Sequence, residues 1–172
     1  EVGMADMLFA TPMRKWDYLF GRFAAGFVAC LVIFAAIALA LMLGPLMPWV
    51  DPQRVGAFSL HAYAWSFGVM VIPNLLFIGA LLMLLAATTR SMLLVYVGVL
   101  GFFVLWGMAG AFTRDINNEW IAVLLDPFGM RALGRMTRYF TSAEANAGLP
   151  PFSGFLLANR LLWLGITVVL FA

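Results

Sequence analysis

Long runs of residues without an ionic group constrain the fold of this chain more than any other feature. One run extends from Phe23 to Met47, a second from Ala62 to Ala87 and a third from Met92 to Phe112. A helix of about 20 apolar residues crosses the roughly 30 Å hydrocarbon core of a bilayer. These runs predict three membrane-spanning helices, and the apolar stretch from Ser153 to Ala172 predicts a fourth, truncated one.

The composition supports the same conclusion. Of the 172 residues, 65% are hydrophobic and 10% are charged, whereas a soluble domain has about 25% charged residues. One core of this size cannot hide the excess, because roughly a third of such a domain's surface stays in water. We therefore expect an all-α membrane protein, a polytopic bundle of about four helices.

Charge and cysteine content exclude several other classes. The net charge of +2 rests on too few ionic groups to form a basic patch for nucleic acid. The single cysteine, Cys30, excludes an internal disulfide framework and a cysteine-based metal cluster. The chain begins with Glu1 rather than Met and shows no signal-peptide pattern, so we expect it to be a fragment of a longer protein.

The expected organisation has four parts. Residues 1–22 form an amphipathic cytoplasmic segment that rests on the membrane surface and then turns into it, with a second helix beginning at Pro12. Residues 23–112 hold three spanning helices, 113–152 form an extracytoplasmic excursion, and 153–172 begin the last span. Arg14, Lys15 and Arg22 favour a cytoplasmic start, although the arginines of residues 113–152 count against it.

The excursion is expected to contain an amphipathic interfacial helix. Asp126 and Pro127 read as an N-cap followed by proline in the first turn. Arg131, Arg135 and Arg138 then share one face, and they either bind lipid headgroups or form a solvated face. Further along, Thr141 and Glu144 have the spacing of a capping box.

Few polar groups lie within the spans. Pro73 and Asn74 interrupt the second span and kink its helix, and two readings remain open: a hinge or polar pathway lining, or an Asn74 hydrogen bond to a neighbouring helix. Arg160 lies about one turn inside the fourth span, and we expect it to snorkel to the surface.

The chain lacks the sequence motifs of a catalyst. It has no Asp or Glu inside an apolar run, no H-E-x-x-H metal motif and no phosphate-binding loop. We therefore expect neither a catalytic residue nor a metal or cofactor in this chain. The missing buried carboxylates also disfavour an ion-coupled carrier, so energy for any transport is expected to come from another domain or subunit.

The order of several short motifs resembles a known family. The opening EVGMADMLFATPMRK, the later LDPFG and TRYF, and the run NRLLW beginning at Asn159 are similar to type-2 ABC transporter permeases of bacteria, some of which are fused to a zinc aminopeptidase domain. The resemblance implies a bundle of six helices per half, of which this chain holds the third to fifth, the start of the sixth and the segment before them. It also places the chain in the bacterial inner membrane.

The resemblance further implies that the opening segment is a coupling helix that docks on an ABC ATP-binding subunit. ATP and magnesium would then belong to that partner, and a second permease half or a homodimer would complete the transporter. The expected docking residues are Glu1, Asp6, Leu8, Thr11, Pro12, Arg14 and Lys15. The other reading is a plain juxtamembrane helix held by lipid.

Two functions follow from these expectations. The first is a permease subunit that couples ATP hydrolysis in a partner to movement of a substrate across the membrane. The alternative is a membrane anchor for an enzyme such as a fused aminopeptidase, and sequence beyond Ala172 would separate the two.

Overall fold

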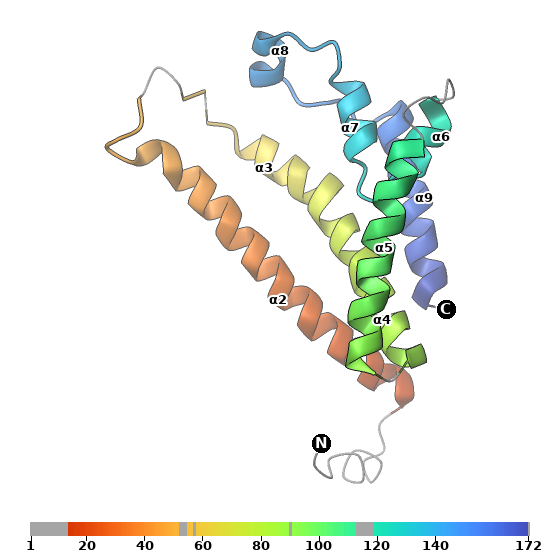
Figure 1. The fold of residues 1–172 in the computed structure, drawn as a ribbon. Coiled ribbons are helices and arrows are strands. Elements are labelled where there is room, and N and C mark those ends of the chain that lie inside the picture. The colour runs from red at the N-terminus through yellow and green to blue at the C-terminus, as the bar shows by residue number, and fades with distance from the viewer. Residues whose placement is uncertain (1–13, 52–54, 57, 90, 113–118, 172) are drawn as a thin grey trace.

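The computed structural model describes residues 14–51, 55–56, 58–89, 91–112 and 119–171. Within these ranges the chain is helical and has no strand. Four helical stretches are long and apolar enough to cross a membrane (Figure 1). The prediction of an all-α membrane bundle with four spans is confirmed.

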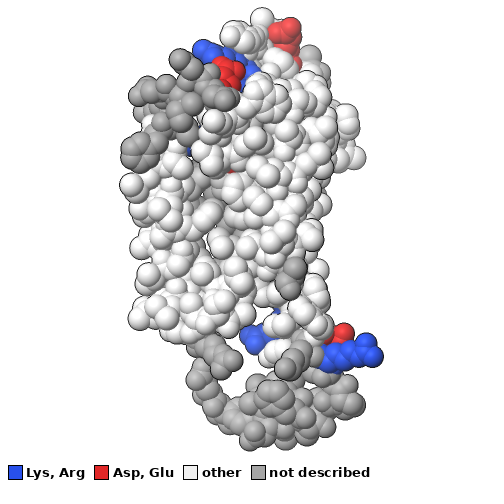
Figure 2. Space-filling model, turned by 90° about the vertical axis from the view of Figure 1, so that its right-hand side faces the viewer, with Lys and Arg blue, Asp and Glu red and all other residues white. Residues whose placement is uncertain are grey.

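The spanning stretches match the predicted runs closely. They are α2 (Lys15–Leu43), a second stretch formed by α3 (Leu60–Ser66), η3 (Phe67–Val71) and α4 (Ile72–Thr89), then α5 (Met92–Phe112) and α9 (Gly154–Phe171). On the face shown in Figure 2, nearly all of the charged surface lies at the two ends, and the body between them is almost entirely white. This distribution suits a multi-pass membrane protein, whose middle section lies in hydrocarbon.

Helix α2 corrects the predicted boundary at residue 22. The expected turn between a surface segment and the first span is absent, because Lys15–Leu43 forms one unbroken helix. No proline occurs between Lys15 and Gly44, so nothing in this stretch removes a backbone donor or ends the helix. The helix ends at Leu43, a few residues before the end of the apolar run at Met47, and the short 3₁₀ turn η1 (Gly44–Leu46), which contains Pro45, follows it.

The second span changes its winding just before Pro73. The five residues of η3 form a π-helical turn, and α4 then begins at Ile72. A proline inside a helix lacks the N–H that would bond the carbonyl four residues earlier, and its ring crowds that carbonyl. A wider turn immediately before Pro73 accommodates this defect, in agreement with the predicted interruption.

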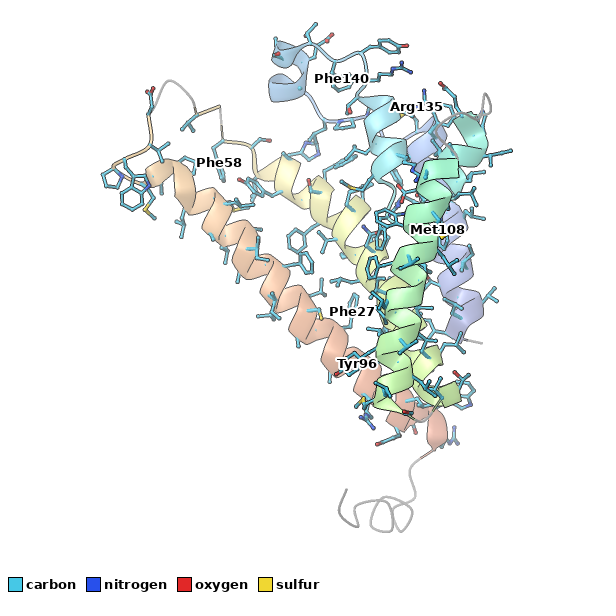
Figure 3. All side chains as sticks on the ribbon, in the orientation of Figure 1. Phe27, Phe58, Tyr96, Met108, Arg135 and Phe140 are labelled. Carbon is cyan, nitrogen blue, oxygen red and sulfur yellow. The ribbon has the colours of Figure 1, made fainter. Side chains whose placement is uncertain are left out.

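Helix α4 is the centre of the bundle. It packs against α2, α5 and α9, and α4 and α5 are separated by only two residues of the chain. Large apolar side chains of α2 and α5 are exposed, Tyr96 and Met108 of α5 among them (Figure 3). Such an apolar exterior is stable in contact with lipid rather than water.

The connection between α5 and α9 forms a cap over one end of the bundle. It contains α6 (Glu119–Leu124), α7 (Met130–Met136) and α8 (Ser142–Ala147), and both α6 and α7 pack on α9. Val123, Ala132 and Leu156 form its buried core, with Trp65 and Val69 packed against them. The capping box of Thr141 and Glu144 is confirmed at the start of α8.

The predicted interfacial helix needs a correction. It does not start at Pro127, because α7 begins at Met130 and has Gly129, at a φ of 70°, as its N-cap residue. It also ends at Met136, so Arg138 lies beyond it. The carboxylate of Asp126 nevertheless accepts a hydrogen bond from the backbone N–H of Arg131 at 2.8 Å and so caps α7 from a distance.

Candidate functional site

The predicted docking segment lies mostly outside the described residues. The part that lies outside contains Glu1, Asp6, Leu8, Thr11 and Pro12. Arg14 is the extended, exposed residue immediately before α2, and Lys15 is the first residue of that helix. The two basic positions are therefore attached directly to a spanning helix.

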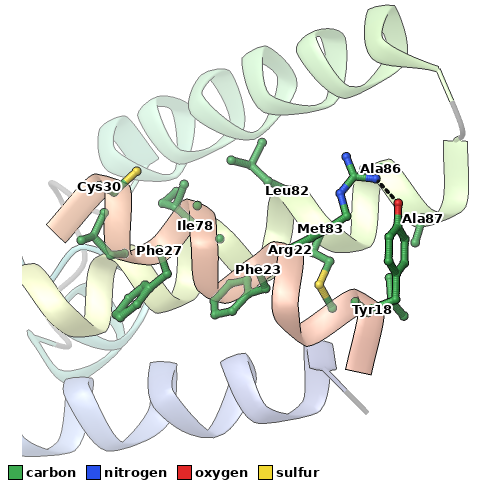
Figure 4. A pocket seen from close by; sticks show the side chains of 14 residues that line it. Tyr18, Arg22, Phe23, Phe27, Cys30, Ile78, Leu82, Met83, Ala86 and Ala87 are labelled. Atoms are coloured by element: carbon green, nitrogen blue, oxygen red, sulfur yellow. Dashed lines mark hydrogen bonds between the residues drawn. The ribbon is translucent and has the colours of Figure 1, made fainter. Parts of the chain in front are cut away.

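An apolar groove lies between the N-terminal half of α2 and α4 (Figure 4). Its volume is about 480 Å³, and apolar side chains such as Phe27, Ile78 and Leu82 line most of it. Arg22 lies near one end, where its Nη1 donates to the hydroxyl of Tyr18 at 2.8 Å and its guanidinium lies 5.5 Å from the centre of the Tyr18 ring. The groove thus combines an apolar length with one polar end.

Close packing fixes the base of this groove. A Cβ atom on Gly79 of α4 would lie 2.6 Å from Cε2 of Phe23, so the glycine allows the Phe23 ring to rest on the α4 backbone. The same ring meets Phe171 of α9 edge to face, with the ring centres 4.8 Å apart. The beginning of α2 is thereby held by both α4 and α9.

A second feature is a buried polar cluster near the opposite end of the bundle. Its centre is Arg160 of α9, whose residue is only 2% exposed. The guanidinium donates from Nη1 to Oδ1 of Asn74 at 2.8 Å, from Nη2 to the carbonyl of Pro127 at 3.3 Å, and to Oδ1 of Asn159 from both Nε and Nη2. Arg160 thus joins α4, α9 and the loop before α7.

Asn159 and Asp126 extend the cluster. Asn159 donates to the carbonyls of Val123 and Asp126 at 2.7 and 2.8 Å. The Asp126 carboxylate, itself fully buried, accepts from Nε1 of Trp106 at 3.1 Å and from the backbone N–H of Phe128 at 3.2 Å. Among the described residues, no buried side-chain nitrogen or oxygen lacks a hydrogen-bond partner. The cluster therefore meets the condition under which buried polar groups are tolerated.

These contacts correct the prediction for Arg160. The side chain does not snorkel to the surface; it turns inward, because carbonyl and amide oxygens of the loop and of α4 satisfy its donors there. The predicted Asn74 bond to a neighbouring helix is observed, since Asn74 accepts from Arg160 and donates to the carbonyl of Phe128 at 3.3 Å. Pro73 is buried beside it.

The backbone conformation of Gly129 and its lack of a side chain allow the loop before α7 to pack on the cluster. Gly129 adopts a φ of 70°, which disfavours any residue with a side chain. A Cβ atom at this position would also collide with the guanidinium of Arg160. The loop can therefore pass over Arg160 only because residue 129 is glycine.

The three interfacial arginines lie together at the cap. Arg131, Arg135 and Arg138 line one open cavity of about 400 Å³ between α5, α6 and α7. Arg131 also donates to the carbonyl of Ala122 at 3.4 Å, and Arg135 forms an ion pair with Glu119. The three arginines that were predicted to share a face thus line one cavity.

Asn159 and Trp163 enter the sequence-based predictions only as parts of the NRLLW motif, without a place in a buried cluster, and Trp106 is not singled out there. Trp163 donates from Nε1 to the carbonyl of Leu124 at 2.9 Å and ties α9 to the end of α6. A signal was present, because Asn159, Trp163 and Thr167 recur at helical spacing on the side of α9 that also carries Leu156. Polar side chains along one stripe of a spanning helix indicate a face turned towards protein.

Family models, curated proteins and solved structures were compared with the chain, and none of them matches it.

Proposed function

We propose that this chain is part of the permease subunit of an ATP-driven ABC exporter in the bacterial inner membrane. ATP hydrolysis occurs in a partner subunit that docks on the N-terminal segment, and the helices move a substrate across the membrane. The order of the EVGMADMLFATPMRK, LDPFG, TRYF and NRLLW motifs supports the proposal. Arg14 and Lys15 then face the cytoplasm.

The observation that carries this proposal is the continuity of α2. A docking segment can move a bundle only if a rigid body connects the two. Helix α2 begins at Lys15 and runs unbroken through the span, while Phe23 within it contacts both Gly79 of α4 and Phe171 of α9. A displacement at Arg14 is therefore passed directly to three of the spanning helices.

The lining of the groove between α2 and α4 suits an amphipathic substrate. Its apolar length suits a hydrocarbon chain, and the Tyr18–Arg22 pair at one end suits a polar or anionic head. The outward faces of α2 and α5 are apolar and exposed, which leaves room for the second permease half that the proposal requires.

Charge reversal in the full-length protein tests the docking role. The variant Arg14→Glu/Lys15→Glu should lose co-purification with the nucleotide-binding subunit in mild detergent and should lose its stimulation of ATP hydrolysis. Arg90→Glu is the matched control, because it reverses a charge at a position that follows α4 in the sequence and lies outside the predicted docking segment. Unchanged co-purification and ATPase stimulation in the double variant would refute docking and favour a membrane anchor.

Cysteine labelling tests the orientation. In a Cys30→Ala background, Arg14→Cys should react with a membrane-impermeant maleimide only after the cytoplasmic face is exposed. Tyr139→Cys, 84% exposed on the cap, should react from the outside of intact cells. Labelling of Arg14→Cys from outside would place the N-terminal segment away from ATP and end the proposal.

A further inference from the structure

The cavity that contains the three arginines has the chemistry of a phosphate-binding site. One guanidinium group can donate two parallel hydrogen bonds to two oxygens of the same phosphate. Its planar geometry suits this anion better than the geometry of an ammonium group does. Arg131, Arg135 and Arg138 come from the same short segment and line about 400 Å³ of open space. Gly134 lines the same space, and no atom lies within 4 Å of the position its Cβ would take.

The local charge favours an anion. Asp126 is buried behind the cavity, where Trp106 and two backbone N–H groups bind its carboxylate. Glu119 pairs with Arg135. Of the described residues that line the cavity, the charged ones are all arginines, so this lining carries positive charge.

The position of the cavity relative to the spans points to a lipid. Gly110, in the last turn of α5, forms part of its wall. A Cβ there would lie 2.5 Å from Nη2 of Arg131. The absence of a side chain at Gly110 therefore allows the Arg131 guanidinium to pack against the end of α5. Trp120 and Ile121 of α6 are about half exposed at the same end, and tryptophan is typical of the membrane–water interface.

An apolar path leads from the cavity along α5. Phe103 and Gly107 lie one to two turns before Gly110 on the same face of the helix, given 3.6 residues per turn. Phe103 is 44% exposed, and the space beside Gly107 is open for at least 4 Å from its Cβ position. A hydrocarbon chain attached to a bound phosphate would therefore lie along this face.

We propose that the cavity binds the phosphodiester headgroup of an anionic phospholipid, with an acyl chain along Phe103 and Gly107. The inference holds whichever side of the membrane the cap faces. It is also independent of the proposed export function, since a membrane anchor could carry the same site.

Lipid binding to the full-length protein, delipidated in dodecyl maltoside, tests this site by native mass spectrometry. Palmitoyl-oleoyl phosphatidylglycerol should bind more tightly than phosphatidylcholine with the same chains. Arg135→Gln/Arg138→Gln should weaken phosphatidylglycerol binding by about five-fold per arginine removed. Arg90→Gln, the same change at a position in the sequence between α4 and α5, should leave phosphatidylglycerol binding unchanged. These two substitutions spare Arg131, which the Ala122 carbonyl ties to the fold.

A second pair of variants tests the acyl path separately from the headgroup. Gly107→Leu should weaken phosphatidylglycerol binding, whereas Gly101→Leu, on the opposite face of α5 and equally open, should not. Equal binding of the two lipids, or full binding by the double arginine variant, would overturn the proposal. Displacement of phosphatidylglycerol by excess inorganic phosphate alone, with no effect of Gly107→Leu, would assign the cavity to a free anion instead.

Discussion

Arg160 of α9 and Asn74 of α4, 86 positions apart in the chain, are joined by a 2.8 Å hydrogen bond from Nη1 to Oδ1. The bond crosses the most extensive helix–helix contact of the bundle, that between α4 and α9. It also lies one residue after Pro73, where the second span has just recovered its α-helical winding. The pair therefore fixes the position of α9 against the irregular part of α4.

Removal of this bond should destabilise the bundle. Asn74→Ala leaves Arg160 without one acceptor, and polar contacts between spanning helices contribute about 0.5–2 kcal/mol. We expect a loss of about 1–2 kcal/mol in unfolding by denaturing detergent. In a double-mutant cycle with Arg160→Met, the two losses should be less than additive by about 0.5–3 kcal/mol.

Thr167→Val provides the matched control for Asn74→Ala. Thr167 is also buried on α9, but its hydroxyl bonds only the carbonyl of Trp163 in the same helix. Its loss should cost about 0.5 kcal/mol or less, because that carbonyl can keep its helical bond. Equal effects of Asn74→Ala and Thr167→Val would contradict a special role for the contact between α4 and α9.

Three glycine-to-alanine substitutions distinguish the cost of a positive φ from the cost of a steric clash. Gly129→Ala combines a positive φ with a clash against Arg160, so it should lower stability by more than about 2 kcal/mol. Gly154→Ala has the positive φ and open space, and should cost about 1 kcal/mol. Gly134→Ala, helical and open, should be neutral or stabilising by about 0.5 kcal/mol. Thermal unfolding in detergent measures the order, and an equal cost at positions 129 and 154 would show that Arg160 moves aside freely.

Asp126→Asn should loosen the start of α7. Asp126 accepts three N–H donors, and an amide nitrogen in place of one oxygen would face at least one of them. We expect a loss of about 1–2 kcal/mol and faster hydrogen exchange at the amides of Phe128 and Arg131. Asp17→Asn, at an exposed site in the first turn of α2, should change stability by about 0.5 kcal/mol or less. Unchanged exchange at Arg131 would refute the capping role of Asp126.

The capping box of α8 should depend on pH. Hydrogen bonds from the backbone N–H and then the hydroxyl of Thr141 lower the pKa of Glu144 below its ordinary value. A lowered pKa in the folded state stabilises α8 above the unfolded-state pKa, and this stabilisation disappears as the pH falls through the lowered value. The Thr141 amide resonance should therefore titrate with a midpoint below the ordinary pKa value of a glutamate carboxyl group. A midpoint at or above that value would show that the box does not favour the carboxylate.

Replacement of Gly26 by a residue with a large side chain should close the groove between α2 and α4. Side chains of a helix lean towards its N-terminus, so Cys30 lies over Gly26, and both line the groove. Gly26→Leu should slow the reaction of Cys30 with N-ethylmaleimide. Gly21→Leu, which adds the same volume at an open position outside the groove, should not. Equal rates in the two variants would mean that Cys30 is reached from elsewhere.

The sequence was sufficient to predict the spans but not the buried cluster. Span prediction succeeds because any run of about 20 apolar residues must cross the bilayer as a helix, whatever its neighbours are. The position of Arg160 depends instead on what its face of α9 meets. Its acceptors, Asn74 and the Pro127 carbonyl, come from segments far away in the chain. The prediction that Arg160 snorkels used only its distance from the end of the helix, and it was wrong.

The start of α7 was mispredicted for a similar reason. Asp126 and Pro127 have the sequence of a helix start, and Asp126 does cap the helix. Gly129, however, inserts a left-handed residue between them and Met130. The sequence alone could not show that Arg160 lies beneath residue 129 and requires glycine there.

The unbroken form of α2 has a mechanical consequence. Its 29 residues make a rod about 43 Å long at 1.5 Å per residue, and its contacts with Gly79 and Phe171 lie near the end that begins at Lys15. From Phe23 to Leu43 the rod extends about 30 Å. A tilt of about 5° around that pivot would sweep the far tip through about 2.6 Å, so the helix acts as a lever that magnifies small movements at its foot.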